Sequence, residues 1–297
     1  MKAVLAGTLG GPEVLRLGEV DEPHAGPGEV RISVRAVGVN PIDWKIRSDN
    51  WPFPVELPFV PGIEAAGVVD EVGADVDGVA LGDQVFGLTR RGTAQYAVLR
   101  AWAAKPAALS WAEAAAVASS AETATRTLDL LGLVSGQTIV VNGASGSVGT
   151  AAVQLARLRG AIVIGTASEA NHDVLRDLGA TPVTYGDGLF ARVRELAPQG
   201  VDLALDTAGR GALPDLIALT SSPDRVVTIA DPDAEALGVR FSGSGDRGDA
   251  LAPVAGLIEA GRYRVTVART FPMAETGEAH RIGQAGHGPG KLVVLVE

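Results

Sequence analysis

The chain has 297 residues, of which 46% are hydrophobic and 20% charged, and its formal net charge at pH 7 is −10. This length is about twice that of a typical domain of ~150 residues, so we expect two domains. The composition excludes a disordered polymer, and the negative charge argues against a nucleic-acid partner. Because the sequence has no cysteine and only four histidines, it offers no disulfide scaffold, no thiol nucleophile and no cysteine-ligated zinc or iron–sulfur site.

The N-terminal residues and the lengths of the apolar runs predict where in the cell the protein is located. No apolar run approaches the ~20 residues that a membrane-spanning helix requires, so no membrane partner is expected. A short apolar run follows Lys2, but Gly10-Gly11-Pro12 comes too early for the apolar core of a signal peptide. This pattern predicts a first β-strand and a cytoplasmic protein.

From Met1 to about Lys105 the pattern is that of short strands. Val30–Val37 alternates apolar and polar side chains, the period-two pattern of a half-buried strand. Glycine and proline clusters separate further strands that we predict at 66–72, 84–88 and 95–99. Short strands at this spacing are typical of a small barrel or a partly open β domain.

Near Pro106 the pattern changes to alternating helices and strands. Ser110 and Glu113 have the spacing of a capping box before an alanine-rich helix, and a second helix is predicted at about 123–131. Strands are then predicted at 138–142, 161–166, 182–185, 201–206, 225–230 and 239–241, and helices at 149–159, 171–178, 189–196 and 212–219. Such alternation predicts an α/β domain with a mostly parallel, doubly wound sheet.

After Gly261 the pattern reverts to that of the N-terminal part. We predict a strand at 262–268, a helix at 273–282 and a final strand at 291–296. The expected layout is therefore a β-rich domain built from residues 1–110 and 262–297, with an α/β domain, residues 111–261, inserted between its two parts.

The most informative motif is a glycine turn after the apolar strand at 138–142. Ala144, Gly146 and Gly149 fall on the three glycine positions of the G-x-G-x-x-G dinucleotide motif, with alanine at the first. Gly146 would let the backbone approach a pyrophosphate, Gly149 would let the next helix pack on the strand, and the N–H groups of residues 147–148 would face the phosphates. The flanking strands and helix have the required spacing, which favours dinucleotide binding over the alternative of a structural βαβ turn.

The choice between NAD and NADP depends on the end of the next strand, where NAD-binding proteins carry an acidic residue for the ribose 2′-OH. Ala167 aligns with that residue and Ser168 follows it, which makes room for a 2′-phosphate and offers it a donor. Glu169 keeps NAD open, because a strand ending one or two residues later would place its carboxylate at the ribose. No Arg or Lys stands at 167–172. We expect NADPH, with NADH as the alternative.

Several segments, in this order, also carry a family resemblance: Gly38–Asp43, Pro61–Val69, Gly82–Val85, Gly143–Gly149, Leu178–Ala180 and Gly290–Val293. Over nearly its whole length the chain resembles the medium-chain dehydrogenase/reductase superfamily, in its zinc-free quinone oxidoreductase (zeta-crystallin-like) branch. The resemblance implies a GroES-like β-rich catalytic domain, a Rossmann domain, a cleft between them that holds NADPH, and a homodimer.

The resemblance also implies roles for individual residues. Thr123 matches the threonine beside the nicotinamide, Asn40 is expected to face the active cleft, and the main chain after Phe241 would flank the nicotinamide. Tyr185 matches a tyrosine that stacks near the adenosine 2′-phosphate, and Lys291 lies on a C-terminal stretch that can close over the cofactor. The predicted cofactor-binding residues are thus Asn40, Thr123, Ala144, Ser145, Gly146, Ser147, Val148, Gly149, Ser168, Tyr185 and Lys291.

Three departures from relatives affect the chemistry. Ile63 stands where zinc-dependent relatives have a histidine ligand, so no metal site and no zinc are expected. Trp51 lies in the loop where some enoyl reductases carry a proton-donating tyrosine, so the acid is missing or comes from elsewhere. Asn40 and Asp43 are the catalytic candidates, with a solvated loop charge as the alternative reading of Asp43. The stretch Ser119–Thr125 replaces a more apolar family stretch with a polar one.

The aromatic residues near position 50 and the histidines allow further predictions. Trp44, Trp51 and Phe53 would form an apolar wall for a flat substrate or simply pack in the core. The histidines have no partner spacing for a metal or a catalytic triad.

The expected activity is hydride transfer from NADPH to a quinone or an α,β-unsaturated carbonyl, without zinc. Such acceptors need no metal to polarise them, because the anion formed on reduction is delocalised. Two alternatives remain open: a biosynthetic enoyl reductase of the same superfamily, and an NADPH-binding sensor or regulatory protein with little turnover.

Overall fold

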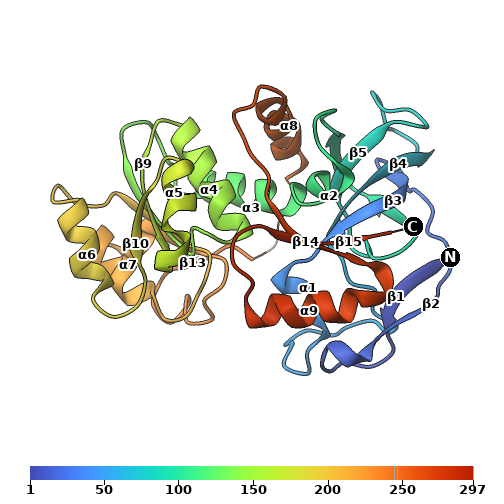
Figure 1. Ribbon diagram of the computed structural model, residues 1–297, viewed down its shortest axis with the longest axis horizontal. Coiled ribbons are helices and arrows are strands. Elements are labelled where there is room, and N and C mark those ends of the chain that lie inside the picture. Colours follow the sequence, from blue (N-terminus) through green and yellow to red (C-terminus); the bar gives the residue numbers. More distant parts are fainter. Residues whose placement is uncertain (244, 246, 297) are drawn as a thin grey trace. The chain divides into compact units, whose positions relative to one another are not determined.

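The computed structural model describes residues 1–243, 245 and 247–296. The chain divides into two compact units: unit 2 consists of Ser120–Gly245, and unit 1 of the chain before and after it (Figure 1). A mixed α/β architecture with an inserted second unit is what the sequence predicts. The boundaries differ, because residues 111–119 and 247–261 belong to unit 1 and not to the inserted unit.

Unit 1 contains two β-sheets. A two-stranded antiparallel sheet pairs β1 (Lys2–Ala6) with β2 (Leu15–Glu19). The larger, seven-stranded sheet has the order β14-β15-β3-β4-β5-β7, with β6 paired to β3. Its strands are β3 (Val30–Gly38), β4 (Glu64–Val72), β5 (Gln84–Leu88), β6 (Tyr96–Leu99), β7 (Ala101–Ala104), β14 (Val267–Pro272) and β15 (Lys291–Leu295). The apolar positions of the alternating strand β3, such as Ile32 and Val34, are buried in the core of this unit, as the period-two pattern predicts.

Short helices cover the sheets of unit 1. They are α1 (Pro41–Arg47), α2 (Trp111–Ala114), α8 (Leu251–Glu259) and α9 (Thr276–Ala285), with 3₁₀ turns η1 (Pro12–Val14), η4 (Gly248–Ala250) and η5 (Met273–Glu275). The capping box is present: Ser110 N donates to Glu113 Oε2 (2.8 Å) and Glu113 N donates to Ser110 Oγ (3.2 Å). The helix that it starts ends after one turn.

One sequence prediction for unit 1 needs correction, and two of its helices were not predicted. No strand forms over 262–266, and β14 begins only at Val267. Helix α1 was not expected because it has only seven residues, and its first turn depends on the contact of Asp43 with the Asn40 N–H. Helix α8 was also missed, although Leu251, Val254, Ala255 and Ile258 have the helical spacing and are buried.

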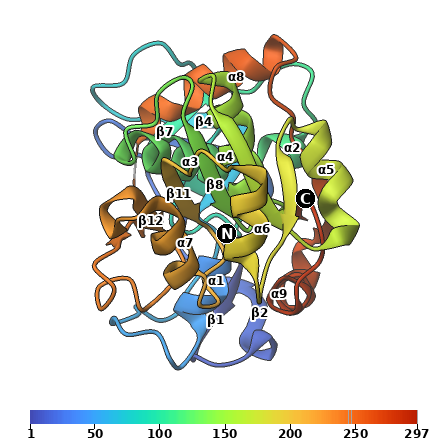
Figure 2. The ribbon, with the colours of Figure 1, turned by 90° about the vertical axis from the view of Figure 1, so that its left-hand side faces the viewer.

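Unit 2 is a parallel six-stranded sheet of order β10-β9-β8-β11-β12-β13 (Figure 2). Its strands are β8 (Thr138–Asn142), β9 (Ile162–Ala167), β10 (Thr181–Thr184), β11 (Leu203–Asp206), β12 (Val226–Thr228) and β13 (Arg240–Phe241). The connecting helices are α4 (Ser147–Leu158), α5 (His172–Asp177), α6 (Leu189–Leu196) and α7 (Leu213–Thr220), with η2 (Glu169–Asn171) and η3 (Pro223–Arg225) between strands. Helix α3 (Ala118–Leu130) leads from unit 1 into this unit. The doubly wound fold is thereby confirmed.

The strand order reverses beside β8. The chain passes from β8 to β9 and β10 on one side, and then returns to β11, β12 and β13 on the other. In doubly wound sheets, ligands bind beyond the carboxyl ends of the strands at such a switch point. Asn142 and Asp206, the last residues of β8 and β11, are paired in register at this point.

In the described part of the chain, no helix combines the length and the apolar character that crossing a membrane requires.

Candidate functional site

The glycine turn lies at the carboxyl end of β8, beside the switch point. Gly143 has a φ of 78°, which L-residues rarely adopt, and a Cβ there would lie 2.7 Å from Thr207 Oγ1. Ala144 is buried, and its N–H donates to Thr166 O on the neighbouring strand (2.9 Å). These contacts fix the path of the backbone into helix α4.

The two later glycines of the motif have different reasons to be glycine. A Cβ at Gly149 would lie 2.2 Å from Gly143 O, so Gly149 is required for the close packing of α4 on the turn. Gly146 has a φ of −75°, which any residue can adopt, and an added Cβ would meet nothing nearer than Gly143 O at 3.4 Å. Packing within the described protein therefore does not require glycine at position 146. The backbone here is exposed, and a ligand could occupy the space beside it.

The start of α4 is suited to an anion. No side chain caps the helix at Gly146, and the first N–H groups of an α-helix, here those of Ser147 and Val148, have no partner within the helix. Together with the positive end of the helix dipole, they form a site for phosphate groups. Ser145 lies beside them and accepts a hydrogen bond from Asn171 Nδ2 (3.4 Å). The residues present therefore fit the pyrophosphate of a dinucleotide.

A buried polar network lies at the ends of the central strands and was missed by the sequence analysis. Asp206 accepts from Asn142 Nδ2 (2.8 Å) and from Thr228 Oγ1 (2.6 Å). Thr166 Oγ1 donates to Asn142 Oδ1 (2.6 Å) and accepts from Gly143 N (3.0 Å). Each of these side chains ends an apolar parallel strand or lies next to its end, which is the sequence signal that could have revealed them. The network connects four strand ends and holds the turn above them in place.

The residues proposed for the adenosine 2′-phosphate come together at the ends of β9 and β10. Ala167 and Thr184 are paired in register, so Ser168 and Tyr185 follow at the same level of the sheet. Strand β9 ends at Ala167, as the alignment behind the NADP prediction assumed, and Glu169 is exposed in the turn that follows. The Tyr185 side chain is half exposed.

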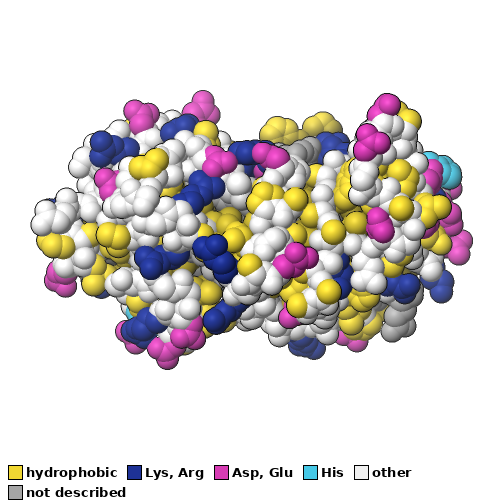
Figure 3. Space-filling model, turned by 90° about the horizontal axis from the view of Figure 1, so that it is seen from above, with side chains coloured by type: hydrophobic (Ala, Val, Ile, Leu, Met, Phe, Trp, Pro, Cys, Tyr) yellow, Lys and Arg dark blue, Asp and Glu magenta, His cyan; other side chains and the backbone are white. Residues whose placement is uncertain are grey.

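A cation that the sequence analysis did not identify also lies here. The Arg192 guanidinium donates to Thr184 O (2.8 Å), Asp187 O (2.7 Å) and Tyr185 O (3.3 Å), and so holds the loop after β10. Several basic side chains also gather on the left part of the face shown in Figure 3. Local positive charge thus exists on a chain of net charge −10, and the net charge does not exclude a phosphate-bearing ligand.

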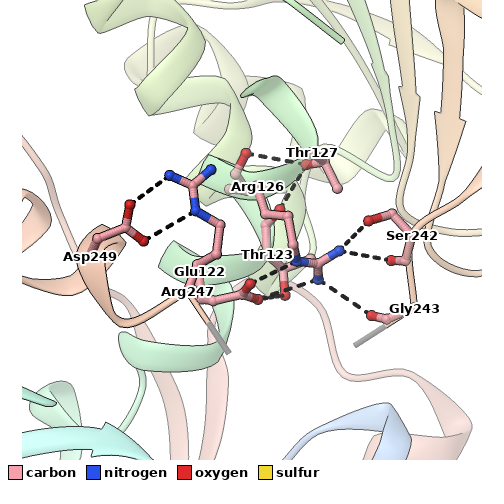
Figure 4. Close-up of polar contacts among 9 residues, drawn as sticks. Glu122, Thr123, Arg126, Thr127, Ser242, Gly243, Arg247 and Asp249 are labelled. Atoms are coloured by element: carbon pink, nitrogen blue, oxygen red, sulfur yellow. Dashed lines mark hydrogen bonds and ion pairs between the residues drawn. The ribbon is translucent and has the colours of Figure 1, made fainter. Parts of the chain in front are cut away.

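Thr123 lies on α3, and the chain after Phe241 follows β13, the edge strand on the other half of the unit 2 sheet. Thr123 is buried, and its hydroxyl donates to Glu122 Oε2 (3.3 Å). Arg126, one turn further along α3, pairs with Glu122 (2.7 Å) and donates to Ser242 O (3.3 Å), as Figure 4 shows. The structure therefore links the two segments that the family resemblance places beside the nicotinamide.

Asn40 and Lys291 lie in a buried network of unit 1. Lys291 Nζ contacts Glu64 Oε1 (2.6 Å) and Asn40 Oδ1 (2.5 Å), while Asn40 Nδ2 donates to Glu64 Oε1 (2.8 Å) and Gly38 O (3.2 Å). The other Glu64 oxygen accepts from Ser119 N (2.8 Å). Lys291 begins β15 inside the seven-stranded sheet, so it does not lie on a stretch free to close over a cofactor. These polar groups are paired within unit 1, and a contact of Asn40 or Lys291 with the cofactor stays a prediction.

Asp43 is likewise buried and fully engaged. Its two carboxyl oxygens accept from Asn40 N (2.8 Å) and Gly62 N (3.0 Å). Burial raises the pKa of Asp43 to about 7, although these N–H donors and Lys291 favour the charged form. Asp43 is 1% exposed and is therefore not a solvated loop charge. Its contacts describe a residue that holds α1 against the loop at Gly62, and we do not assign it a proton transfer.

The three aromatic residues considered for an apolar wall, Trp44, Trp51 and Phe53, divide into two groups. Trp51 and Phe53 form an edge-to-face pair with ring centroids 5.5 Å apart, and Phe53 is 65% exposed. Trp44 instead packs on the buried ring of His280, at 6.1 Å, so it does not belong to the apolar wall. Within residues 1–243, 245 and 247–296, no three His, Cys, Asp or Glu side chains are grouped to hold a metal ion.

Comparisons with known proteins agree with this geometry. Residues 26–124 match the family of alcohol dehydrogenase GroES-like domains, and residues 178–294 match the zinc-binding dehydrogenase family. The whole chain is 30% identical to 98% of a quinone oxidoreductase of Sus scrofa. It is 36% identical to a stretch of the spectinabilin polyketide synthase system protein NorB of Streptomyces orinoci; the match covers 91% of this chain but only 13% of NorB.

Solved structures show the same relationship. The structure of the quinone oxidoreductase from Coxiella burnetii superimposes with a TM-score of 0.87 at 28% identity and covers all of this chain and 99% of its own. A mycobacterial protein solved in complex with NADPH superimposes with a TM-score of 0.86 at 27% identity, over 99% of this chain and all of its own.

Proposed function

Because the chain belongs to the medium-chain dehydrogenase/reductase superfamily, in its quinone oxidoreductase branch, we propose that it is a zinc-independent, NADPH-dependent oxidoreductase. Its acceptor is a quinone or an α,β-unsaturated carbonyl. The observation that carries the proposal is the glycine turn, where Gly146 leaves room that the described protein does not fill and α4 begins without a cap.

The residues of unit 2 would hold the cofactor along the carboxyl edge of its sheet. The N–H groups of Ser147 and Val148 bind the pyrophosphate, with Ala144, Ser145, Gly146 and Gly149 shaping the turn. Ser168 donates to the 2′-phosphate and Tyr185 stacks beside the adenosine. Thr123 contacts the nicotinamide. The bound cofactor supplies the hydride, and the protein positions it and excludes water.

The donor set does not fit zinc. Ile63 has no ligating atom, the chain has no cysteine, and the proposal routes no step through a metal. An acceptor that needs no polarising ion suits such a site, because a reduced quinone or enone spreads its negative charge over several atoms. The delocalised anion can take up its proton from bulk solvent after it leaves the site, so the proposal assigns no side chain as the acid.

A biosynthetic enoyl reductase is the second candidate. It is favoured by the match to a segment of a polyketide synthase protein, which spans 91% of this chain. The two candidates differ only in the acceptor. A nucleotide sensor with little turnover is the third, because Trp51 stands where some relatives have a proton donor.

The proposal extends to the protein's setting. We propose a small-molecule substrate, a homodimer and a cytoplasmic location, as the family resemblance implies. Analytical ultracentrifugation of the purified chain tests the homodimer, and a sedimenting monomer would contradict it.

The test measures nucleotide binding and turnover with the same protein. We expect NADPH to bind roughly 10- to 100-fold more tightly than NADH, since charge-assisted hydrogen bonds to the 2′-phosphate outweigh repulsion by Glu169. Gly146→Val should abolish binding without lowering the unfolding midpoint appreciably. Gly256→Val is the control, because a Cβ at Gly256 meets no atom within 4 Å and this residue lies in unit 1.

Turnover of NADPH with a panel of quinones, enones, enoyl thioesters and aldehydes distinguishes the candidates. Quinone or enone reduction supports the proposed function, and exclusive reduction of enoyl thioesters supports the second candidate. Tight NADPH binding with no turnover on the whole panel would favour the sensor. Unchanged NADPH affinity in Gly146→Val would show that the turn is only structural.

A further inference from the structure

Arg126 and Glu122 form the most enclosed ion pair of unit 2 in the described part of the chain. The Glu122 side chain is 3% exposed and that of Arg126 is 13% exposed. Arg126 Nε donates to Glu122 Oε1 (2.7 Å) and Nη2 donates to Oε2 (3.3 Å), so the pair is bidentate. Burying two charges is expensive, so the pair has to be compensated by good geometry and by further hydrogen bonds.

The same guanidinium reaches a distant part of the chain. Arg126 Nη1 donates to the carbonyl oxygen (3.3 Å) and to the hydroxyl of Ser242, and Nη2 donates to Gly243 O (3.4 Å). These residues follow β13 directly, and Ser242 N continues the sheet by donating to Thr228 O (2.8 Å). Figure 4 shows the guanidinium between Glu122 on one side and Ser242 with Gly243 on the other.

Gly245 supplies an independent observation on the same pair. A Cβ at this position would lie 2.3 Å from Arg126 Nε and 2.4 Å from Glu122 Oε1. The backbone at Gly245 therefore lies directly against the ion pair, and only glycine fits there without moving it. Since unit 2 begins at Ser120 and ends at Gly245, the pair ties together the two ends of this unit.

The place of these residues in the sheet relates them to the cofactor. In a doubly wound sheet each half binds one mononucleotide, and the turn after β8 with Ser168 and Tyr185 takes the adenosine half. The nicotinamide half then lies over the carboxyl ends of β11, β12 and β13. Ser242 follows the last of these strands, and Thr123, which donates to Glu122, lies on α3 one turn before Arg126.

We propose that the Glu122–Arg126 pair is a positioning element for the nicotinamide end of the cofactor: it holds the Thr123 hydroxyl and the backbone of 242–243 in the arrangement that receives the ring. This inference rests on the proposed function. Arg126 acts through Thr123 and through the main chain, and it makes no contact with the reacting atoms. Its loss should therefore weaken the nicotinamide half of binding and spare the adenosine half.

The experiment compares two ligands that differ in the nicotinamide half. NADPH and adenosine 2′,5′-bisphosphate are titrated against the full chain by calorimetry. Arg126→Ala should lower NADPH affinity by about tenfold or more and change the bisphosphate affinity by less than about twofold. Arg126→Lys, which keeps the charge but cannot reach both Glu122 and the carbonyls, should give an intermediate loss.

Two further variants separate positioning from stability. Gly245→Ala keeps both charges, but its methyl group fits only if the ion pair or the backbone against it shifts, so it should reproduce the selective loss even if Arg126→Ala does not fold. Arg159→Ala is the matched control, since Arg159 also pairs with a carboxylate on α3, Asp129 (2.7 Å), whereas it is Arg126 that donates to Ser242 and Gly243. It should leave both affinities unchanged.

The outcomes are distinct. An equal loss of both ligands, or no loss of NADPH in folded Arg126→Ala and Gly245→Ala, would overturn the inference. If the wild-type chain binds neither ligand, the proposed function fails and takes the inference with it. Binding of both ligands by the wild type, with the selective loss in the variants, supports the inference.

Discussion

Unit 1 and unit 2 bury polar side chains in two different ways. In unit 1, Glu64, Lys291, Asn40 and Asp43 satisfy one another and nearby backbone groups. In unit 2, a similar network at the strand ends supports a turn whose own outward N–H groups have no protein cap. A polar group that is fully paired inside the protein stabilises the fold, whereas a group that is positioned and left open can bind a ligand. We propose that this difference distinguishes residues that stabilise the fold from residues that bind the cofactor.

The largest expected effect comes from removing one charge from the buried polar network of unit 1. Glu64→Ala leaves the ammonium of Lys291 buried, at 4% exposure, without its counter-charge. We expect the free energy of unfolding to fall by about 3–5 kcal/mol, measured by chemical denaturation. The double variant Glu64→Leu with Lys291→Met removes both charges and should recover much of this loss. A loss below about 1 kcal/mol in Glu64→Ala would show that the pair is solvated and that the contrast between the units is wrong.

Gly146 and Gly149 extend the comparison to unit 2, because packing requires glycine at position 149 but not at position 146. Gly149→Ala forces a methyl group toward Gly143 O, so it should destabilise the protein by about 1–3 kcal/mol. Gly146→Ala meets no such contact and should cost less than about 1 kcal/mol, while NADPH affinity falls. Thermal unfolding and nucleotide titration of both variants check this. If Gly146→Ala proved the more destabilising, the glycine at 146 would be structural.

A pH titration tests the buried acid of unit 1. Below the ordinary pKa of about 3.8, Asp43 is protonated in both states, and its raised folded pKa of about 7 stabilises the folded protein. This contribution is lost as the pH rises through 7. Burial beside Arg47 lowers the pKa of His280 from 6.5 to about 3, and the stability that depends on its neutral form is lost as the pH falls below 6.5.

Between about pH 4 and 6.5 the two slopes therefore oppose each other, each limited to about 1.4 kcal/mol per pH unit. Asp43→Asn should make the unfolding free energy rise with pH over this range, and His280→Gln should make it fall. Denaturant titrations at several pH values measure both slopes. A profile of Asp43→Asn that runs parallel to that of the wild type would contradict the raised pKa of Asp43.

The smallest expected effect concerns the exposed turn that follows β9 in unit 2. Glu169 is exposed beside Ser168, where its charge opposes a 2′-phosphate. Glu169→Arg should raise NADPH affinity by about three- to tenfold, because exposed charges are screened by solvent, and leave NADH affinity nearly unchanged. Asp187→Arg, in the next loop, serves as a control for a non-specific gain in positive charge. If the wild type prefers NADH and Glu169→Arg loses that preference, Glu169 is the ribose-binding acid.

Most of the unit 2 fold was predictable, because periodic patterns report local structure directly. The strand at 138–142 and the helix at 189–196 match β8 and α6, and the glycine motif lies between a strand and a helix as its spacing requires. Unit 1 was predicted less well. Helix α1 and strand β7 were not predicted, and both depend on contacts with segments distant in the sequence.

The sequence by itself determined the class of the protein: the absence of cysteine, the glycine turn and the alternating strands and helices are local properties that survive without coordinates. Only the tertiary structure decided which polar residues are fully hydrogen-bonded within the protein and which lie where a ligand can reach them. Lys291 and Asn40 are 251 residues apart, and Arg126 and Ser242 are 116 apart. Side-chain partners at such separations are set by strand register and by the packing of whole elements, which no local pattern encodes.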